Sequence, residues 1–157
     1  MRTTYKTPEE AEAAFYEAIE RADIDALENV WSNDDNVVCI HPGATRIEGR
    51  QAVMESFVQL FCEAPMLSFT LVDTLYTGND CLAVHLVREE IALDGQVVSI
   101  MASTNIFQME EGGWRMLLHH ASPEPDMSEY DDLDVSGSFD SDDTGEWVEP
   151  ARPFVLH

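Results

Sequence analysis

The sequence predicts an α+β fold in which helices cover one face of a bent antiparallel sheet. Apolar residues recur at helical spacing before Pro65, whereas alternating runs fill the segments from 67 to 122. Short turn sequences separate these later runs, most clearly Thr77-Gly78-Asn79-Asp80 and Asp94-Gly95. Strands joined by such turns pair as an antiparallel meander, and the segregation of helices from strands is typical of α+β proteins.

The helices are predicted from their caps and apolar stripes. Thr7 caps the first helix, Pro8 suits its first turn, and Glu10 completes a capping box. Asp23 caps a short second helix that reaches Trp31, and a third helix opens after 47–50 and ends before Pro65. A short strand at 37–41 lies between them. The long strands are expected at 67–76, 81–93, 96–109 and 114–122.

Charge and composition limit the partners. The chain has 31 acidic and 8 basic residues, a net charge of −23, and such a surface repels nucleic acid and anionic lipid. No signal peptide and no apolar run of about 18 residues occurs, so we expect no membrane partner. The three cysteines lie in apolar runs without metal spacing, which indicates buried free thiols and a cytoplasmic location. An ordinary acidic protein and one adapted to high salt both fit this charge.

The chain divides into a domain at 1–123 and an acidic tail at 124–157. The tail holds 11 acidic residues and one base, Arg152, and its end at 147–157 is apolar again. A segment so poor in large apolar residues is typical of disorder. The apolar end could bind a protein partner, dock on its own domain or a second subunit, or stay loose.

Several short pieces resemble a known family in their order and spacing. They are Trp31, 39–43, 48–50, 103–107, 113–115 and 120–123. Together they resemble the nuclear-transport-factor-2-like (NTF2-like) superfamily, which includes ketosteroid isomerases, and within it SnoaL-like domains close to the association domain of calmodulin-dependent kinase II. The resemblance implies a cone, with a curved antiparallel sheet wrapped around three N-terminal helices. It also implies a cavity inside the cone and a homodimer through the outer face of the sheet.

Strand alternation and this resemblance select candidate ligand-binding residues. In the association domain, arginines line the pocket at the positions of His85, Asn105 and Ala121. A less charged lining of His85, Asn105 and His119 is therefore expected, with Trp31 and Phe57 as walls.

His41 is the candidate catalytic base. It precedes Pro42 at the place where ketosteroid isomerases carry their Asp-Pro base, and histidine titrates near neutral pH. The isomerases' first-helix tyrosine aligns with Phe15, and Tyr16 should point elsewhere.

The opposite face of the last strand is the candidate dimer interface. Alternation groups Trp114, Met116, Leu118 and His120 there, so Trp114 and His120 are predicted interface residues. Plainer interpretations remain, in which His41 bonds to a turn and His85 with Asn105 forms a self-satisfied buried pair. His41, His85, His119 and Glu89 follow no metal motif, so we expect no metal and no cofactor.

Two classes of function fit these residues. The first is a small-molecule binding protein or an enzyme, acting by proton transfer, isomerisation or hydration on a small apolar or weakly polar ligand. The alternative is a non-catalytic dimeric interaction module whose acidic tail recruits a partner. The sequence leaves open whether the protein is an enzyme.

Overall fold

The computed structural model describes residues 1–63 and 66–125. One compact unit spans Met1–Pro125, and the predicted partner segment at 147–157 lies outside the described residues. The helices are α1 (Pro8–Glu20), α2 (Ile24–Val30) and α3 (Arg50–Glu63). The strands are β1 (Val38–Ile40), β2 (Ile47–Glu48), β3 (Ser68–Gly78), β4 (Leu82–Leu93), β5 (Gln96–Glu110) and β6 (Gly113–Pro123).

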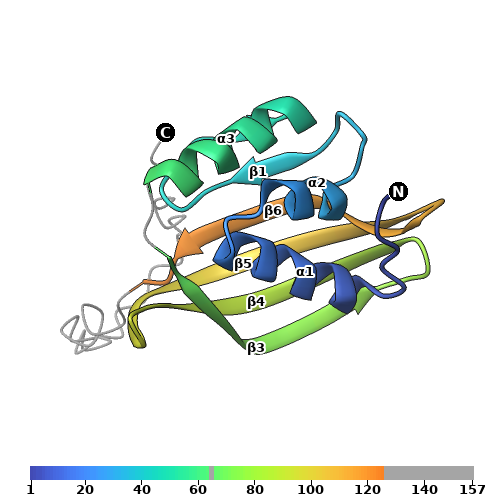
Figure 1. Ribbon diagram of the computed structural model, residues 1–157. Helices are drawn as coiled ribbons and strands as arrows, with labels where there is room; N and C mark the ends of the chain where they lie inside the picture. The colour runs from blue at the N-terminus through green and yellow to red at the C-terminus, as the bar shows by residue number, and fades with distance from the viewer. Residues whose placement is uncertain (64–65, 126–157) are drawn as a thin grey trace, which may run out of the picture. The chain divides into compact units, whose positions relative to one another are not determined.

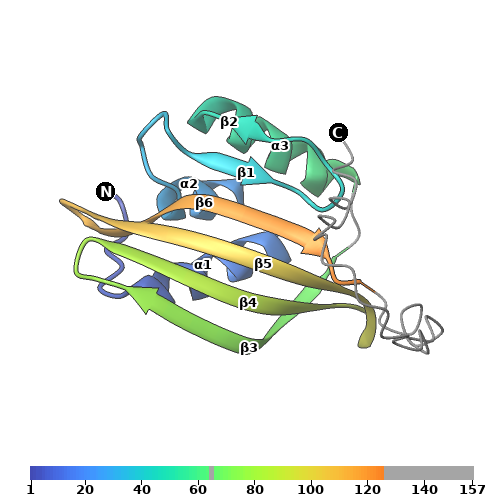
Figure 2. The same ribbon diagram turned by 180° about the vertical axis from the view of Figure 1, so that it is seen from behind.

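The strands form one sheet in the order β2-β1-β6-β5-β4-β3. Neighbouring strands are antiparallel except β1, which runs parallel to β6. Helix α1 lies across one face of the long strands (Figure 1). Figure 2 shows that no helix covers the opposite face of β3 to β6 within the described residues. The predicted α+β architecture is confirmed.

Local chemistry explains where the elements begin and turn. The Thr7 hydroxyl accepts from the Glu10 amide at 3.2 Å, and an Asp23 carboxylate oxygen accepts from the Ala26 amide at 3.0 Å. Asp94 and Gly95 have φ values of 51° and 79°, so both central residues of this hairpin are left-handed, as a type I′ turn requires. Strand β2 was not predicted, because two residues carry too little pattern.

The core is built around three aromatic rings. Phe15, Trp31 and Phe57 are almost fully buried, and their ring centroids lie 6.0 to 6.2 Å apart. The pairs Phe15–Trp31 and Phe15–Phe57 meet edge to face, the arrangement that aromatic quadrupoles favour. Trp31 therefore anchors α2 inside the core.

A β-bulge in β6 overturns one prediction from strand alternation. Ile106 pairs with Leu118, but the next residue, Phe107, pairs with Met116, so Leu117 is an extra residue. Inward and outward positions exchange at this point. Trp114 is consequently 6 % exposed and belongs to the core, so its predicted place on the outer face is wrong. Met116 is buried for the same reason, whereas His120, beyond the bulge, is exposed as predicted.

The cysteines only partly match expectation. All three are free, and Cys39 is buried in β1, but Cys62 and Cys81 are exposed at an element end and in a turn. Only some residues of the apolar runs around Cys62 and Cys81 face the core, and these two thiols are not among them. Among the described residues, no helix has the length and apolar character needed to cross a membrane.

Candidate functional site

A partly open cavity of about 200 Å³ lies between α1, α3 and the covered face of the sheet. Apolar side chains make most of its wall, and four polar side chains interrupt it, Tyr16, His41, Glu89 and His119. The other lining residues are Ile19, Pro42, Phe57, Leu60, Leu67, Phe69, Ile91 and Ala121. An apolar cavity with a few convergent titratable groups is the usual form of a small-molecule site.

Strands β1 and β6 bring the two histidines together. His41 follows β1, and the register of β1 with β6 places Cys39 beside His119. Since side chains two residues apart share a face, His41 and Cys39 both turn toward the covered side. The predicted pairing of His41 with His119 in one cavity agrees with this geometry, and Phe57 lies beside the His41 ring with centroids 4.9 Å apart.

Tyr16 lies in the cavity wall, contrary to the prediction that it points elsewhere. Its hydroxyl donates to Glu89 Oε1 at 2.6 Å and accepts from Asn105 Nδ2 at 3.0 Å. Both Phe15 and Tyr16 are buried because α1 lies flat on the sheet, so its buried arc is wider than one apolar stripe. The cavity thus contains a phenol from the first helix that sequence alignment assigned to the wrong position.

A buried polar network supports this wall from behind. Glu12, only 2 % exposed, accepts from Asn105 Nδ2 at 3.0 Å and lies 3.0 Å from His85 Nδ1 through the same carboxylate oxygen. Its other oxygen accepts from the Tyr76 hydroxyl at 3.2 Å, and the Tyr76 ring stacks on His85 at 3.9 Å. Every member is partnered, which is what a buried carboxylate requires.

The network changes the expected roles of three residues. His85 and Asn105 do not line the cavity, since Asn105 lies behind Tyr16 and His119, and His85 borders a separate open groove beside Tyr76. Trp31 does not line it either, because it is fully buried in the core. The plainer expectation of a polar pair that satisfies itself needs correction, because His85 and Asn105 are linked through the Glu12 carboxylate, to which each of them bonds.

His119 is held in a single protonation state by Asn105. The Asn105 amide donates through Nδ2 to two oxygens, so its Oδ1 faces His119 Nδ1 at 2.6 Å and accepts a hydrogen bond from it. Burial, reinforced by the nearby His41 and His120 imidazoles, lowers the pKa of His119 to about 3. A neutral ring with its proton on Nδ1 leaves Nε2 as a hydrogen-bond acceptor.

His41 is held by a different partner. The Ser56 hydroxyl donates its single proton to the Val53 carbonyl at 2.6 Å, so it accepts from His41 Nε2, 2.9 Å away. The proton therefore lies on Nε2 and the lone pair on Nδ1. Burial lowers the pKa of His41, which keeps the ring neutral near pH 7.

Glu89 is the acidic group in the same cavity wall as His41. Burial raises the pKa of its carboxyl group, and the hydrogen bond from Tyr16 opposes part of that rise. Strand alternation placed Glu89 with His85, but the sequence suggested only a metal role for it. The sequence analysis missed Glu12 entirely, although a charged residue between Ala11 and Phe15 on a buried helix face was a usable indication. No group of three or more metal-ligating side chains is present among the described residues.

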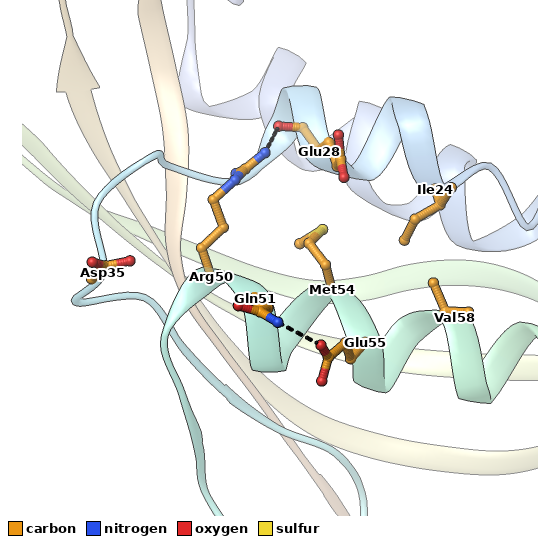
Figure 3. A pocket seen from close by; sticks show the side chains of 8 residues that line it. All are labelled: Ile24, Glu28, Asp35, Arg50, Gln51, Met54, Glu55 and Val58. Atoms are coloured by element: carbon orange, nitrogen blue, oxygen red, sulfur yellow. Dashed lines mark hydrogen bonds between the residues drawn. The ribbon is translucent and has the colours of Figure 1, made fainter.

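A second hollow lies between α2 and α3 (Figure 3). Its volume is about 500 Å³, and Ile24, Met54 and Val58 form its apolar part. The Arg50 guanidinium at one end donates to three backbone carbonyls at the end of α2, at 2.8 to 3.1 Å. No histidine lines this hollow, and the guanidinium that lines it is occupied by the chain itself, so the cavity beside His41 and His119 is the better candidate for chemistry.

Comparison with known proteins agrees with this fold. The family model of the SnoaL-like domain matches residues 9–126. The chain belongs to the SnoaL-like domain family. A solved protein from Thiobacillus denitrificans, assigned as a calcium/calmodulin-dependent protein kinase type II association domain, is 34% identical with a TM-score of 0.73. The match covers 79% of this chain and 100% of that one.

Two further relatives differ in kind from the association-domain protein. A protein from Streptomyces avermitilis, assigned as a dehydratase of the NTF2-like family, is 27% identical with a TM-score of 0.66, over 73% of this chain and 91% of its own. The F-box protein SKIP8 of Arabidopsis thaliana is 27% identical over 118 residues, which are 69% of this chain and 46% of that protein. The chain thus spans less than half the length of this curated relative.

Proposed function

We propose that this SnoaL-like domain binds a small, largely apolar molecule in the cavity beside His41 and His119 and that His41 accepts a proton from it. The observation that carries the proposal is the state of His41. Its ring lies in the cavity wall, its Nε2 proton is committed to Ser56, and its lowered pKa leaves Nδ1 unprotonated near pH 7. Among the described side chains, the only hydrogen-bonding contact of Nδ1 is the weak one from the Cys39 thiol at 4.0 Å, and a neutral imidazole of this kind is a competent general base.

Glu89 supplies the opposite chemistry in this proposal. Tyr16 occupies its Oε1, so a proton on the Glu89 carboxyl group resides on Oε2. Burial favours that protonated form by raising its pKa. A base and an acid whose environments shift their pKa values in opposite directions are suited to proton transfer, isomerisation or hydration. The relative assigned as a dehydratase supports this class of reaction.

Hydrogen exchange tests the proposal directly. The α-hydrogens of cyclohexanone, a one-ring carbonyl compound of suitable size, exchange with D₂O when a base removes them. We expect the full chain to accelerate this exchange, followed by proton NMR, and His41→Gln to remove about 10²-fold of the acceleration. His120→Gln is the matched control, because His120 lies on the exposed face. Equal exchange rates with wild type and His41→Gln would reject the role of His41.

A homodimer through the outer sheet face is a second part of the proposal. Leu82 and Leu86 are 39 % and 42 % exposed on β4, a strand that no described helix covers on this side. Exposed apolar side chains gathered on one face are typical of an interface, and the relative assigned as an association domain supports assembly. Leu86→Glu should give a monomer in sedimentation velocity, whereas Val58→Glu on α3 should leave the dimer intact. A monomeric wild-type chain would contradict this part.

The interaction-module alternative follows from the same face and from the F-box relative, in which the domain is part of a longer protein. In that case the cavity would have no ligand, and residues 147–157 would recruit a protein partner. Cyclohexanone exchange at the uncatalysed rate, together with a stable dimer, would favour this alternative. A cytoplasmic location belongs to both versions, because free thiols persist in reducing compartments, and cell fractionation would check it.

A further inference from the structure

The hydrogen-bond donors around the cavity are already used by the protein. The Tyr16 hydroxyl donates to Glu89, His41 Nε2 donates to Ser56, and His119 Nδ1 donates to Asn105. Each of the two imidazoles therefore has one nitrogen that carries a lone pair and no proton. Nε2 of His119 and Nδ1 of His41 are both acceptors. The Cys39 thiol lies 4.0 Å from His41 Nδ1, whereas no donor from the described residues forms a hydrogen bond at 3.5 Å or less with His119 Nε2.

An unpaired hydrogen-bond acceptor in an apolar wall favours ligands that carry a hydrogen-bond donor. A ligand that covers this nitrogen excludes water from it, and an acceptor left unpaired in this way costs free energy, so a ligand that donates a hydrogen bond there gains relative to one that cannot. His119 cannot switch to a donor under ordinary conditions, since its pKa of about 3 keeps Nε2 unprotonated. Among the described lining groups, only a protonated Glu89 can donate to a ligand.

The size and surface of the cavity define the rest of the ligand. A dry apolar cavity of roughly 150 Å³ can hold benzene, and this one has about 200 Å³. Ile19, Leu60, Leu67, Phe69 and Ile91 give it an apolar wall suited to one ring. An ammonium group would also donate, but its desolvation in such a wall costs far more than that of a hydroxyl.

We propose that the cavity takes a single-ring, uncharged compound that bears a hydroxyl group, and that His119 Nε2 accepts the hydroxyl hydrogen bond. This inference rests on the proposed function, because it requires a ligand in the cavity. His119 then acts as a positioning residue that orients the ring, and His41 remains the group that takes a proton. The division follows from their partners, since Asn105 holds one ring and Ser56 the other.

Phenol and toluene form the test pair, because they differ by a hydroxyl in place of a methyl group. Binding to the full chain is measured by NMR titration. We expect phenol to bind about 3- to 10-fold more tightly than toluene, the range of one net hydrogen bond. His119→Phe should abolish that preference, and His120→Phe, the same change on the exposed face, should keep it.

Nitrogen chemical shifts in the wild-type chain give a readout that does not depend on a variant. Phenol should move the His119 Nε2 resonance, and toluene should not. Equal affinity for the two compounds would overturn the inference while leaving a ligand-binding cavity in place. Tighter binding of benzylamine than of benzyl alcohol would overturn it in favour of a cationic ligand. Binding of none of these compounds would overturn both this inference and the proposed function.

Discussion

Replacing Tyr16 with phenylalanine removes one oxygen from the centre of the polar network and leaves the ring in place. That oxygen makes two hydrogen bonds, one to Glu89 Oε1 at 2.6 Å and one from Asn105 Nδ2 at 3.0 Å. Asn105 keeps its second acceptor, Glu12, but Glu89 Oε1 loses the hydrogen bond from Tyr16. The substitution therefore isolates the cost of a buried carboxyl oxygen without its donor.

The expected magnitude follows from burial. Tyr16 is 5 % exposed and Glu89 is 2 % exposed, so water replaces the lost hydroxyl poorly. Leaving such a group unsatisfied costs about 1–3 kcal/mol, and we expect Tyr16→Phe to lower the free energy of unfolding by about 2 kcal/mol. The pKa of Glu89 should rise further, because the Tyr16 hydrogen bond is one of the effects that lower it.

Urea denaturation followed by tryptophan fluorescence measures this loss, and Tyr76→Phe is the matched control. Tyr76 also donates to a network carboxylate, Glu12, but at 3.2 Å and with 44 % of its surface exposed. Its loss should cost less than about 1 kcal/mol, since water can take the place of the hydroxyl. Equal losses for the two variants, or a neutral Tyr16→Phe, would refute the buried Tyr16–Glu89 bond.

Three shorter predictions test other parts of the account. His119 has a pKa of about 3 in the folded chain against an ordinary 6.5, so between these pH values only the unfolded chain binds the proton. The free energy of unfolding should therefore be largest above pH 6.5 and fall between pH 6.5 and 3. His119→Phe should flatten that fall in urea titrations at several pH values. Gly78→Ala should destabilise strongly, because an added Cβ would lie 2.2 Å from the Leu82 carbonyl oxygen, whereas Gly95→Ala meets no atom within 4 Å and should cost about 1 kcal/mol in the same assay. Iodoacetamide should label the two exposed thiols but spare Cys39, whose pKa burial raises to about 12; mass spectrometry showing labelled Cys39 in the native protein would contradict its burial.

The fold could be predicted closely from the sequence because its indications are local. Caps at Thr7 and Asp23 and the turn at Asp94-Gly95 each depend on a few adjacent residues, and each behaves as predicted. The bulge at Leu117 depends instead on how β6 pairs with β5, which no pattern within β6 reports. Because one extra residue exchanges the two faces of a strand, Trp114 was assigned to the wrong side.

The site could be predicted only in part. His41, His119 and Phe57 were found because strand alternation and a family position pointed to them, and they share one cavity. Tyr16 and Glu12 were missed because both depend on how far α1 rolls onto the sheet, a tertiary property. The separate roles of the two histidines depend on Ser56 and Asn105, and side-chain hydrogen bonds of this kind have no sequence signature.

The central claim is that ligands enter the cavity beside His41 and His119, and methyl-resolved NMR of the full chain with phenol tests it most directly. The account predicts shifts at Leu67 and Ile91, which line that cavity, and none at Ile24 and Val58, which line the open hollow between α2 and α3. Shifts confined to Ile24 and Val58 would contradict it and would place the binding site between the helices.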